Sequence, residues 1–199
     1  MIKCLLEQAR TSLNPWRLYH YTKKSGCCVQ LMIINILDKR IFLHKAEKAG
    51  APLVLHPTVQ DEGEEVYREV RRIADTDFNY AAIGNINWND EMSPWPVLPV
   101  IKGDEPFTGG ADSFLEALEG SILPGIINIL NDSPKYVAFA GYSLSGLCAV
   151  YSMYRSSLFR RIASASGSFW YPGFPEYAKS HELKTKPEKL YFSLGDKEA

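Results

Sequence analysis

The stretch from Tyr136 to Tyr151 reads YVAFAGYSLSGLCAVY, and it decides the fold. It opens with a short apolar run, YVAFA, which is typical of a buried strand, and it continues into a segment with the period of an amphipathic helix. Between the two stands GYSLSG, which leaves space only for a sharp turn. A strand that enters a helix through such a turn, with a serine at its centre, is the setting of a nucleophile elbow.

Ser143 is the predicted nucleophile of this turn. The usual pattern is G-x-S-x-G, because the residues two before and two after the serine must be small where neighbouring backbone packs closely. Here these positions hold Gly141 and Ser145, which are both small. Ser145 is the less suitable nucleophile, because two residues after it stands the bulky Leu147. The N–H of Leu144, at the positive end of the helix, is the predicted oxyanion-hole donor. The alternative is a polar turn without catalysis, since serine and glycine favour turns in any case.

Strands alternate with helices on both sides of this turn. An N-terminal β-hairpin is predicted from Gln30–Leu37 and Ile41–Lys45, joined at Asp38-Lys39. Further strands are predicted at Pro52–His56, Tyr80–Ile86, Tyr136–Ala140, Ile162–Ser166 and Lys189–Leu194, and helices at Glu62–Ala74, Ala111–Leu130 and Gly146–Arg155, with a break or kink at Pro124. The pattern predicts an α/β fold, with a mostly parallel sheet, helices on both faces, and chemistry at the carboxyl ends of the strands.

Residues 1–31 differ from the rest of the chain. They show no sustained period and mix aromatic residues with the pair Cys27-Cys28. We interpret them as an atypical N-terminal extension, with Met32 as a candidate natural start. Residues 32–199 then form a partial α/β domain.

The composition argues against several classes of function. The 199 residues carry 22 Lys and Arg against 23 Asp and Glu, a formal net charge of −1, so no basic footprint for a nucleic acid is present. No apolar run approaches the ~20 residues that span a bilayer, and we expect no membrane partner. The four cysteines form no CxxC pair, and no spacing of histidines or carboxylates is typical of a metal site. We therefore expect a cytoplasmic protein without a metal or other cofactor.

Other motifs carry a resemblance to a known family. They are SASGSFW at Ser164–Trp170, EMSPWP at Glu91–Pro96, FTGGAD at Phe107–Asp112 and SLGDKE at Ser193–Glu198. With the elbow, they resemble the esterases related to enterochelin esterases, within the α/β-hydrolase superfamily, from about Met32 to the end of the chain. The resemblance implies hydrolysis of a small-molecule carboxylic ester through an acyl-enzyme. The acyl, aryl or siderophore-like nature of the ester stays open, and an elbow serves peptidases and thioesterases equally.

The resemblance also implies the remaining site residues. In this superfamily the triad runs in the order serine, acid, histidine, and the acid follows the second strand after the elbow. That position holds Asp196, with Glu198 as the second choice, and a plain turn aspartate is the alternative. The second oxyanion donor would come from the loop after the PLVLH strand. It would be Thr58 or Val59, because Pro57 has no N–H.

No histidine follows Asp196, where the family order puts the base. His20 and His44 precede the core or lie in the hairpin, His56 is expected to be structural, and His181 falls in a polar stretch and is expected to be solvated. We therefore expect the last strand and helix of the fold to be missing. The chain should be nearly inactive alone, because loss of a triad member costs roughly a thousand- to a million-fold in turnover.

Two functions consequently stay open. One is a serine esterase of which this chain is a fragment, and the other is a non-catalytic α/β-hydrolase-like module for binding or interaction. In either case the missing strand would leave an exposed sheet edge, through which the chain could associate with itself.

Aromatic residues gather in the loops that follow the strands. Trp88, Trp95 and Trp170 are predicted to line a substrate pocket near the nucleophile, because their loops belong to the catalytic edge of the sheet. Packing of the loops themselves is the alternative, since large aromatic side chains dominate burial in any protein.

Overall fold

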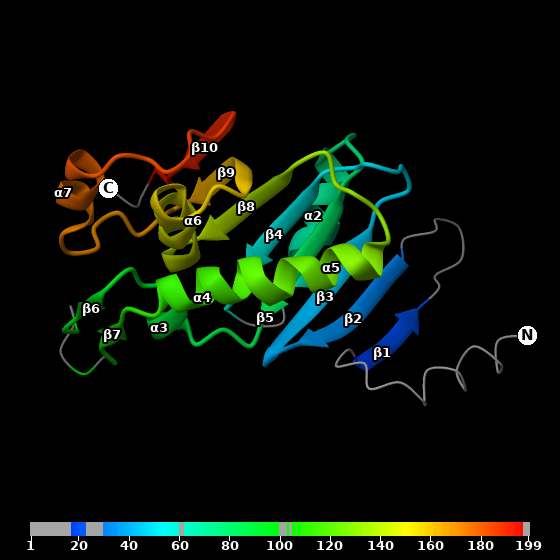
Figure 1. Ribbon diagram of the computed structural model, residues 1–199, viewed down its shortest axis with the longest axis horizontal. Coiled ribbons are helices and arrows are strands. Elements are labelled where there is room, and N and C mark those ends of the chain that lie inside the picture. The colour runs from blue at the N-terminus through cyan, green and yellow to red at the C-terminus, as the bar shows by residue number, and fades with distance from the viewer. Residues whose placement is uncertain (1–16, 23–29, 60–61, 100–102, 104, 197–199) are drawn as a thin grey trace, which may run out of the picture.

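A mixed sheet of eight strands runs through the computed structural model, which describes residues 17–22, 30–59, 62–99, 103 and 105–196 (Figure 1). The strands are β1 (Arg17–Thr22), β2 (Gln30–Ile36), β3 (Lys39–Lys45), β4 (Leu53–Pro57), β5 (Asn79–Gly84), β8 (Val137–Tyr142), β9 (Phe159–Ala165) and β10 (Lys189–Ser193). Their order is β1-β2-β3-β5-β4-β8-β9-β10. Neighbours from β1 to β5 are antiparallel, and neighbours from β5 to β10 are parallel. The predicted mostly parallel sheet is confirmed.

Helices cover both faces of this sheet. They are α2 (Gly63–Ile73), α3 (Trp88–Glu91), α4 (Ala111–Ala117), η1 (Leu118–Ile122), α5 (Leu123–Leu130), α6 (Leu144–Arg155) and α7 (Phe174–Ser180), while β6 (Pro96–Val97) and β7 (Phe107–Thr108) form a separate two-stranded sheet. Figure 1 shows α4, α5 and α6 in front of the sheet and α2 behind it. Right-handed crossovers impose this arrangement, because the steps from β4 to β5 and from β8 to β9 advance in opposite directions across the sheet.

The two faces of the sheet bury different amounts of apolar surface. Side chains alternate along β4, so that Leu53 and Leu55 join the large cluster under α4, α5 and α6, whereas Val54 joins a small cluster under α2. The small cluster centres on Tyr67 and Phe78. The core is therefore deep on the α6 side of the sheet and shallow on the α2 side.

The long helix formed by α4, η1 and α5 continues from Ala111 to Leu130, although the sequence favoured a break or kink at Pro124. Proline has no N–H for the carbonyl four residues earlier. The turn directly before it widens into the π-helix η1, and the helix goes on.

This helix is also the one described segment whose length and composition would let it cross a membrane, with a mean hydropathy of 1.3. The expectation that no apolar stretch approaches this length is therefore corrected. Leu118 and Ile126 within it are fully buried against the sheet. Packing in the protein core accounts for its apolar composition.

The sheet reaches into the region that the sequence sets apart as an extension. β1 pairs with β2, and the boundary expected between residues 31 and 32 falls inside β2. The predicted hairpin of β2 and β3 is present, but its turn is Leu37-Asp38, because Ile36 pairs directly with Lys39. Residues 1–16 and 23–29 of the expected extension lie outside the described residues.

β10 forms one edge of the described sheet. It pairs in parallel with β9, and no other described strand lies along its outer side. Its apolar side chains stay exposed, with relative exposures of 46% for Leu190, 60% for Tyr191 and 52% for Phe192.

Candidate active site

Ser143 lies between β8 and α6 in a backbone conformation that serine rarely adopts, with φ 56° and ψ −122°. These angles are those of the first central residue of a type II′ turn. They turn the chain from the strand directly into the helix, as an elbow requires. A non-glycine residue held in a sparsely populated region costs roughly 1–3 kcal/mol, and such strain gathers at functional sites.

Close approaches of the backbone explain the small residues around this turn. A Cβ atom on Gly141 would lie 2.2 Å from the carbonyl carbon and oxygen of Ser145. A Cβ atom on Gly146 would lie 2.8 Å from the Oγ of Ser164 in β9. The glycine usually found two residues after the serine therefore stands one residue later, where it lets α6 approach β9.

Ser145 occupies the position that is usually glycine, and its hydroxyl braces the turn. Its Oγ accepts the N–H of Tyr142 at 2.9 Å and donates to the carbonyl of Tyr142 at 3.0 Å. The residue is fully buried. A buried hydroxyl bonded to the backbone in this way is poorly placed to attack a substrate, which supports Ser143 as the nucleophile.

The end of β9 holds Ser143 from the other side. The N–H of Ser143 donates to the carbonyl of Ala165, and the carbonyl of Ser143 accepts the N–H of Ser168, both at 3.1 Å. The Oγ of Ser143 lies 3.3 Å from the Oγ of Ser168, whose residue is only 2% exposed. The sequence analysis did not single out Ser168, although the SGSFW motif that contains it was the available signal.

Leu144 stands where an oxyanion donor is expected. It is the first residue of α6, so its N–H belongs to the amides at a helix start that have no intrahelical acceptor. The same helix end carries a positive partial charge. A negative oxygen that forms next to Ser143 could accept the N–H of Leu144 and would be stabilised by this partial charge.

Thr58 does not offer the second donor, and this prediction is corrected. Its N–H donates to the carbonyl of Ile83 at 3.0 Å, and its Oγ1 lies 3.4 Å from the same oxygen. Both groups thus extend the pairing of β4 with β5, and the residue is buried. Val59, the other candidate in this loop, is exposed.

Asp196 lies at the same edge of the sheet as Ser143. The three parallel strands end in register, because Tyr142 pairs with Ala165 and Ala165 pairs with Ser193. Two strand spacings, about 10 Å, separate the ends of β8 and β10. Asp196 is exposed just beyond the end of β10, so the edge carries a hydroxyl and a carboxyl with the end of β9 between them.

Two of the histidines, the buried His44 and the half-buried His56, make their contacts with tyrosines. His44 stacks on Tyr67 with ring centroids 3.7 Å apart, and the Nδ1 of His56 lies 2.7 Å from the Oη of Tyr80. Burial lowers the pKa of both imidazoles to about 4. Both rings are therefore neutral near pH 7, and the structural role expected for His56 agrees with its contact.

His181 belongs to the end of α7. Its Nδ1 lies 3.1 Å from the carbonyl oxygen of Tyr177 and 3.0 Å from the Oγ of Ser180, and its ring stacks on Tyr177. The residue is exposed, as expected. Among the histidines whose side chains the structure describes, none is hydrogen-bonded to Ser143.

Two of the three tryptophans lie against Tyr171, with ring centroids 5.9 Å apart for Trp95 and 6.4 Å apart for Trp170. Trp95 donates its Nε1–H to the carbonyl of Pro172 at 3.0 Å and packs edge-on against Tyr171, so it ties two loops together. Trp88 is half-buried against the large cluster. Trp170 is 60% exposed. None of them lines the two cavities described next, and for Trp95 the contacts favour loop packing.

A shallow apolar trough of about 560 Å³ lies on the α2 face of the sheet. Small side chains form its floor, among them Ala140, Ala163 and Ala165, and Tyr191 of β10 lies at its rim. Gly141 lines it too, so the trough reaches the strand that carries the elbow. Ser143 itself is not among the lining residues.

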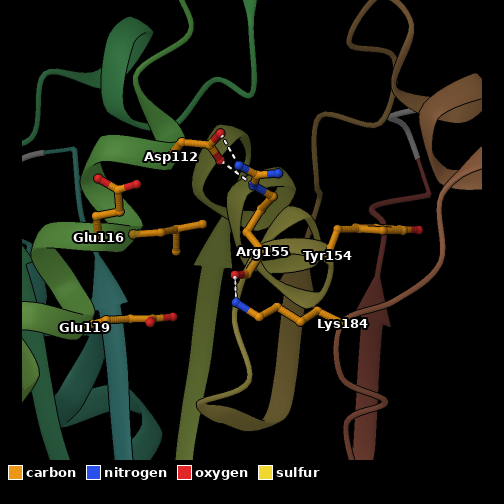
Figure 2. Close-up of a pocket in the computed structure, with 7 residues that line it drawn as sticks. Asp112, Glu116, Glu119, Tyr154, Arg155 and Lys184 are labelled. Carbon is orange, nitrogen blue, oxygen red and sulfur yellow. Dashed lines mark hydrogen bonds and ion pairs between the residues drawn. The ribbon is translucent and has the colours of Figure 1, made fainter.

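A second cavity of about 330 Å³ lies between α4, α6 and the segment before β10 (Figure 2). Asp112 accepts two hydrogen bonds from Arg155, at 2.8 and 2.7 Å, and Lys184 donates to the carbonyl of Arg155 at 2.9 Å. Figure 2 shows Glu119 on the opposite side of the hollow from Lys184. Arg155 ends the helix that Ser143 begins, so about 17 Å of helix separates this cavity from the elbow. Within the described ranges, no group of three or more potential metal ligands occurs.

A mostly parallel sheet with right-handed crossovers and a serine between a strand and a helix, at β8 and α6, are features of one known fold. The chain has the α/β-hydrolase fold.

Comparison with solved structures agrees with this fold. An IroE-like serine hydrolase from Shewanella oneidensis superimposes with a TM-score of 0.58 at 19% identity, over 71% of this chain and 49% of that one. The siderophore hydrolase EstB from Aspergillus nidulans gives 0.58 at 19%, over 92% and 70%. The BES protein from Bacillus cereus gives 0.62 at 16%, over 94% and 78%.

Sequence comparison is sparser. No family model matches the chain. The Bacillus subtilis (strain 168) protein named "Uncharacterized protein YbbA" is 29% identical over 112 residues, which are 55% of this chain and 45% of that protein. The chain thus spans about half the length of this relative and of the Shewanella hydrolase.

Proposed function

We propose that this chain carries the nucleophile of a serine-dependent carboxylic-ester hydrolase. The observation that carries the proposal is the conformation of Ser143, φ 56° and ψ −122° between a strand and a helix. The surrounding sequence maintains this strained turn through Gly141, Gly146 and the hydroxyl of Ser145. The names of the solved neighbours, a serine hydrolase and a siderophore hydrolase among them, support the same chemistry.

The proposed reaction has two halves. The Oγ of Ser143 attacks the ester carbonyl carbon while a base takes the hydroxyl proton, and the oxyanion accepts the N–H of Leu144. The C–O bond to the alcohol then breaks, and the alcohol leaves with the proton. Water attacks the acyl-enzyme in the same way and returns Ser143. Asp196 would orient the histidine that serves as the base.

The base is the part of this mechanism that no described side chain supplies. His44 stacks on Tyr67, His56 is hydrogen-bonded to Tyr80, and His181 contacts the backbone of its own helix. We therefore propose that the 199-residue chain by itself is impaired, by roughly a thousand- to a million-fold against a complete triad.

A non-catalytic binding module is the second candidate. The observation that favours it is the contact of the Ser143 hydroxyl with another neutral hydroxyl, that of Ser168, rather than with a base. An elbow in this state would keep the shape of a hydrolase site without turning substrate over.

Labelling with a fluorophosphonate probe tests the proposal, because the probe reports an activated serine. The wild-type chain is compared with Ser143→Ala and with Ser113→Ala as a control, since Ser113 is an exposed serine of α4. Labelling that disappears in Ser143→Ala and persists in Ser113→Ala supports the nucleophile. A folded wild-type chain that stays unlabelled after long incubation favours the binding module.

A further inference from the structure

The hydroxyl of Ser168 lies beside the proposed nucleophile. Ser168 follows the end of β9, and its Oγ is 3.3 Å from the Oγ of Ser143. The residue is only 2% exposed, and within the described part of the chain its hydroxyl has no other hydrogen-bond partner. Because a buried hydroxyl needs a hydrogen bond, the orientation of this one is tied to Ser143.

The backbone of Ser168 is fixed on both sides. Its N–H donates to the carbonyl of Ser143 at 3.1 Å, and its carbonyl accepts the N–H of Tyr171 at 3.0 Å. Tyr171 is fully buried, and its Oη donates to the carbonyl of Trp95 at 2.5 Å. Ser168 is thus held between the elbow and a buried ring, and its side chain starts from a fixed Cα position.

The turn that leads from β9 to Ser168 also contains a residue with positive φ. Ser166 has a φ of 47°, in the region that favours glycine. The next residue is Gly167, where a Cβ atom would lie 2.3 Å from the Oγ of Ser164. Strained backbone of this kind is found where a function requires a fixed geometry. Here the turn fixes the position of Ser168 next to the elbow.

We propose that Ser168 is a positioning residue for the nucleophile. In this proposal, which rests on the assignment of Ser143 as the nucleophile, the hydroxyl of Ser168 donates to the Oγ of Ser143. A serine side chain otherwise occupies several staggered rotamers, and attack requires the oxygen to lie close to the ester carbon in one orientation. The hydrogen bond selects one rotamer of Ser143 before the substrate binds.

The direction of this hydrogen bond fits each step of the proposed reaction. A hydroxyl can donate one hydrogen bond and accept others, so Ser143 can accept from Ser168 while its own proton goes to the base. In the acyl-enzyme the Oγ of Ser143 carries no proton, and it can still accept from Ser168. Ser168 gains and loses no proton in these steps, so it acts through Ser143 and not on the substrate.

The rate of labelling by a fluorophosphonate probe tests the proposal in the 199-residue chain. Ser168→Ala should lower the second-order rate constant roughly three- to ten-fold, which corresponds to one hydrogen bond between neutral groups. Ser168→Thr keeps the hydroxyl and should restore most of the rate. Ser152→Ala is the matched control and should label like wild type. Ser152 is fully buried and its hydroxyl donates to the carbonyl of Ala149 at 2.6 Å, so this variant loses a buried hydrogen bond that does not involve Ser143.

Several results would overturn the proposal. Equal labelling rates of Ser168→Ala and wild type would do so, and so would a loss in Ser152→Ala as large as that in Ser168→Ala. A third is a Ser168→Thr variant with the urea midpoint of wild type that still labels as slowly as Ser168→Ala. The midpoint of the pH dependence of labelling should be the same in all variants, because Ser168 does not titrate. A shifted midpoint in Ser168→Ala would contradict a positioning role.

The rotamer of Ser143 is a second readout, which requires neither turnover nor a base. Nuclear magnetic resonance of serine-labelled protein gives the couplings between the Hα and Hβ atoms of Ser143, and the signals lost in Ser143→Ala assign them. The couplings should be those of one rotamer in wild type and in Ser152→Ala, and averaged in Ser168→Ala. Averaged couplings in wild type, or unchanged couplings in Ser168→Ala, would refute the proposal. A wild-type chain that keeps one rotamer but is not labelled would count against the esterase function alone.

Discussion

At the scale of single residues, the backbone conformation of Ser143 lowers stability, while its hydroxyl is the group proposed for catalysis. Its φ and ψ suit glycine, yet a hydroxyl is kept there. We expect Ser143→Gly to raise the free energy of unfolding by about 1 kcal/mol, because the strain disappears. Ser143→Ala keeps the Cβ atom and should gain little. Urea unfolding of the two variants checks this, and equal stabilities would mean that the turn is not strained.

His44 is expected to make stability depend on pH. Its pKa is about 4 in the folded chain against 6.5 for an exposed histidine, because burial disfavours the charged ring. The unfolded chain therefore binds the proton more readily, and stability should fall by up to about 3 kcal/mol as the pH drops from about 6.5 to 4. His44→Phe preserves the stacking on Tyr67 and removes the proton site.

Unfolding curves measured at several pH values should show the gap between His44→Phe and wild type widening as the pH falls. The ring nitrogens of His44 have no hydrogen-bond partner among the described residues, so phenylalanine leaves no acceptor or donor behind. A gap that is constant with pH would contradict the burial of a neutral ring.

The sequence located the elbow because it is local: a strand, a serine between small residues, and a helix follow one another directly. It failed where a role depends on a partner far along the chain. The N–H of Thr58 is occupied by Ile83, which lies in another strand. Ser168 reaches Ser143 only because β9 lies beside β8.

At the scale of elements, glycines show where the backbone needs space. We expect Gly141→Ala to destabilise the fold by at least about 2 kcal/mol, because its Cβ would collide with the backbone of Ser145 where α6 meets β8. The Cβ atom of Gly120→Ala, at an exposed position of η1, would meet nothing within 4 Å. The substitution should be neutral or stabilising by up to about 1 kcal/mol. Thermal unfolding distinguishes the two, and similar effects would mean that the elbow tolerates a wider turn.

Elements were predicted well where hydrophobic period and length agreed, as for β4, α2 and α6. The exceptions have physical causes. Pro124 was expected to break or kink the helix, but the turns on both sides are buried in the core and the helix stays continuous. The π-helix η1 directly before the proline accommodates the hydrogen bond that proline cannot donate. β1 escaped notice because a strand at the border of a sheet needs no sustained apolar pattern; its pairing with β2 identifies it.

At the scale of the whole molecule, the two faces of the sheet should differ in what they contribute. Phe139 is fully buried in the large cluster, and Phe78 lies in the small one at 8% exposure. We expect Phe139→Ala to cost roughly 3–5 kcal/mol and Phe78→Ala clearly less, because the shallow side collapses or hydrates more easily. Denaturant midpoints of the two variants measure the difference. An equal loss would mean that the α2 face is packed as tightly as the other.

The architecture could be predicted because alternation of strands and helices permits few arrangements, and the handedness of the crossovers selects among them. The position of β5 between β3 and β4 could not be predicted from the residues, because pairing across a sheet leaves no local signal. The substrate pocket lined by the tryptophans stays a prediction; two of them, Trp95 and Trp170, lie against the same ring, that of Tyr171.

The pairing of β4 with β8 has a consequence for how the chain folds. It joins Leu53 to Val137, and the segment between them must first bring in β5 and the long helix. The elbow, by contrast, closes over the short distance from β8 to β9. Contacts of low sequence separation form faster than contacts of high separation. The half of the sheet that carries Ser143 should therefore form early in folding. The pairing of β4 with β8 should form later and limit the rate at which the complete sheet forms.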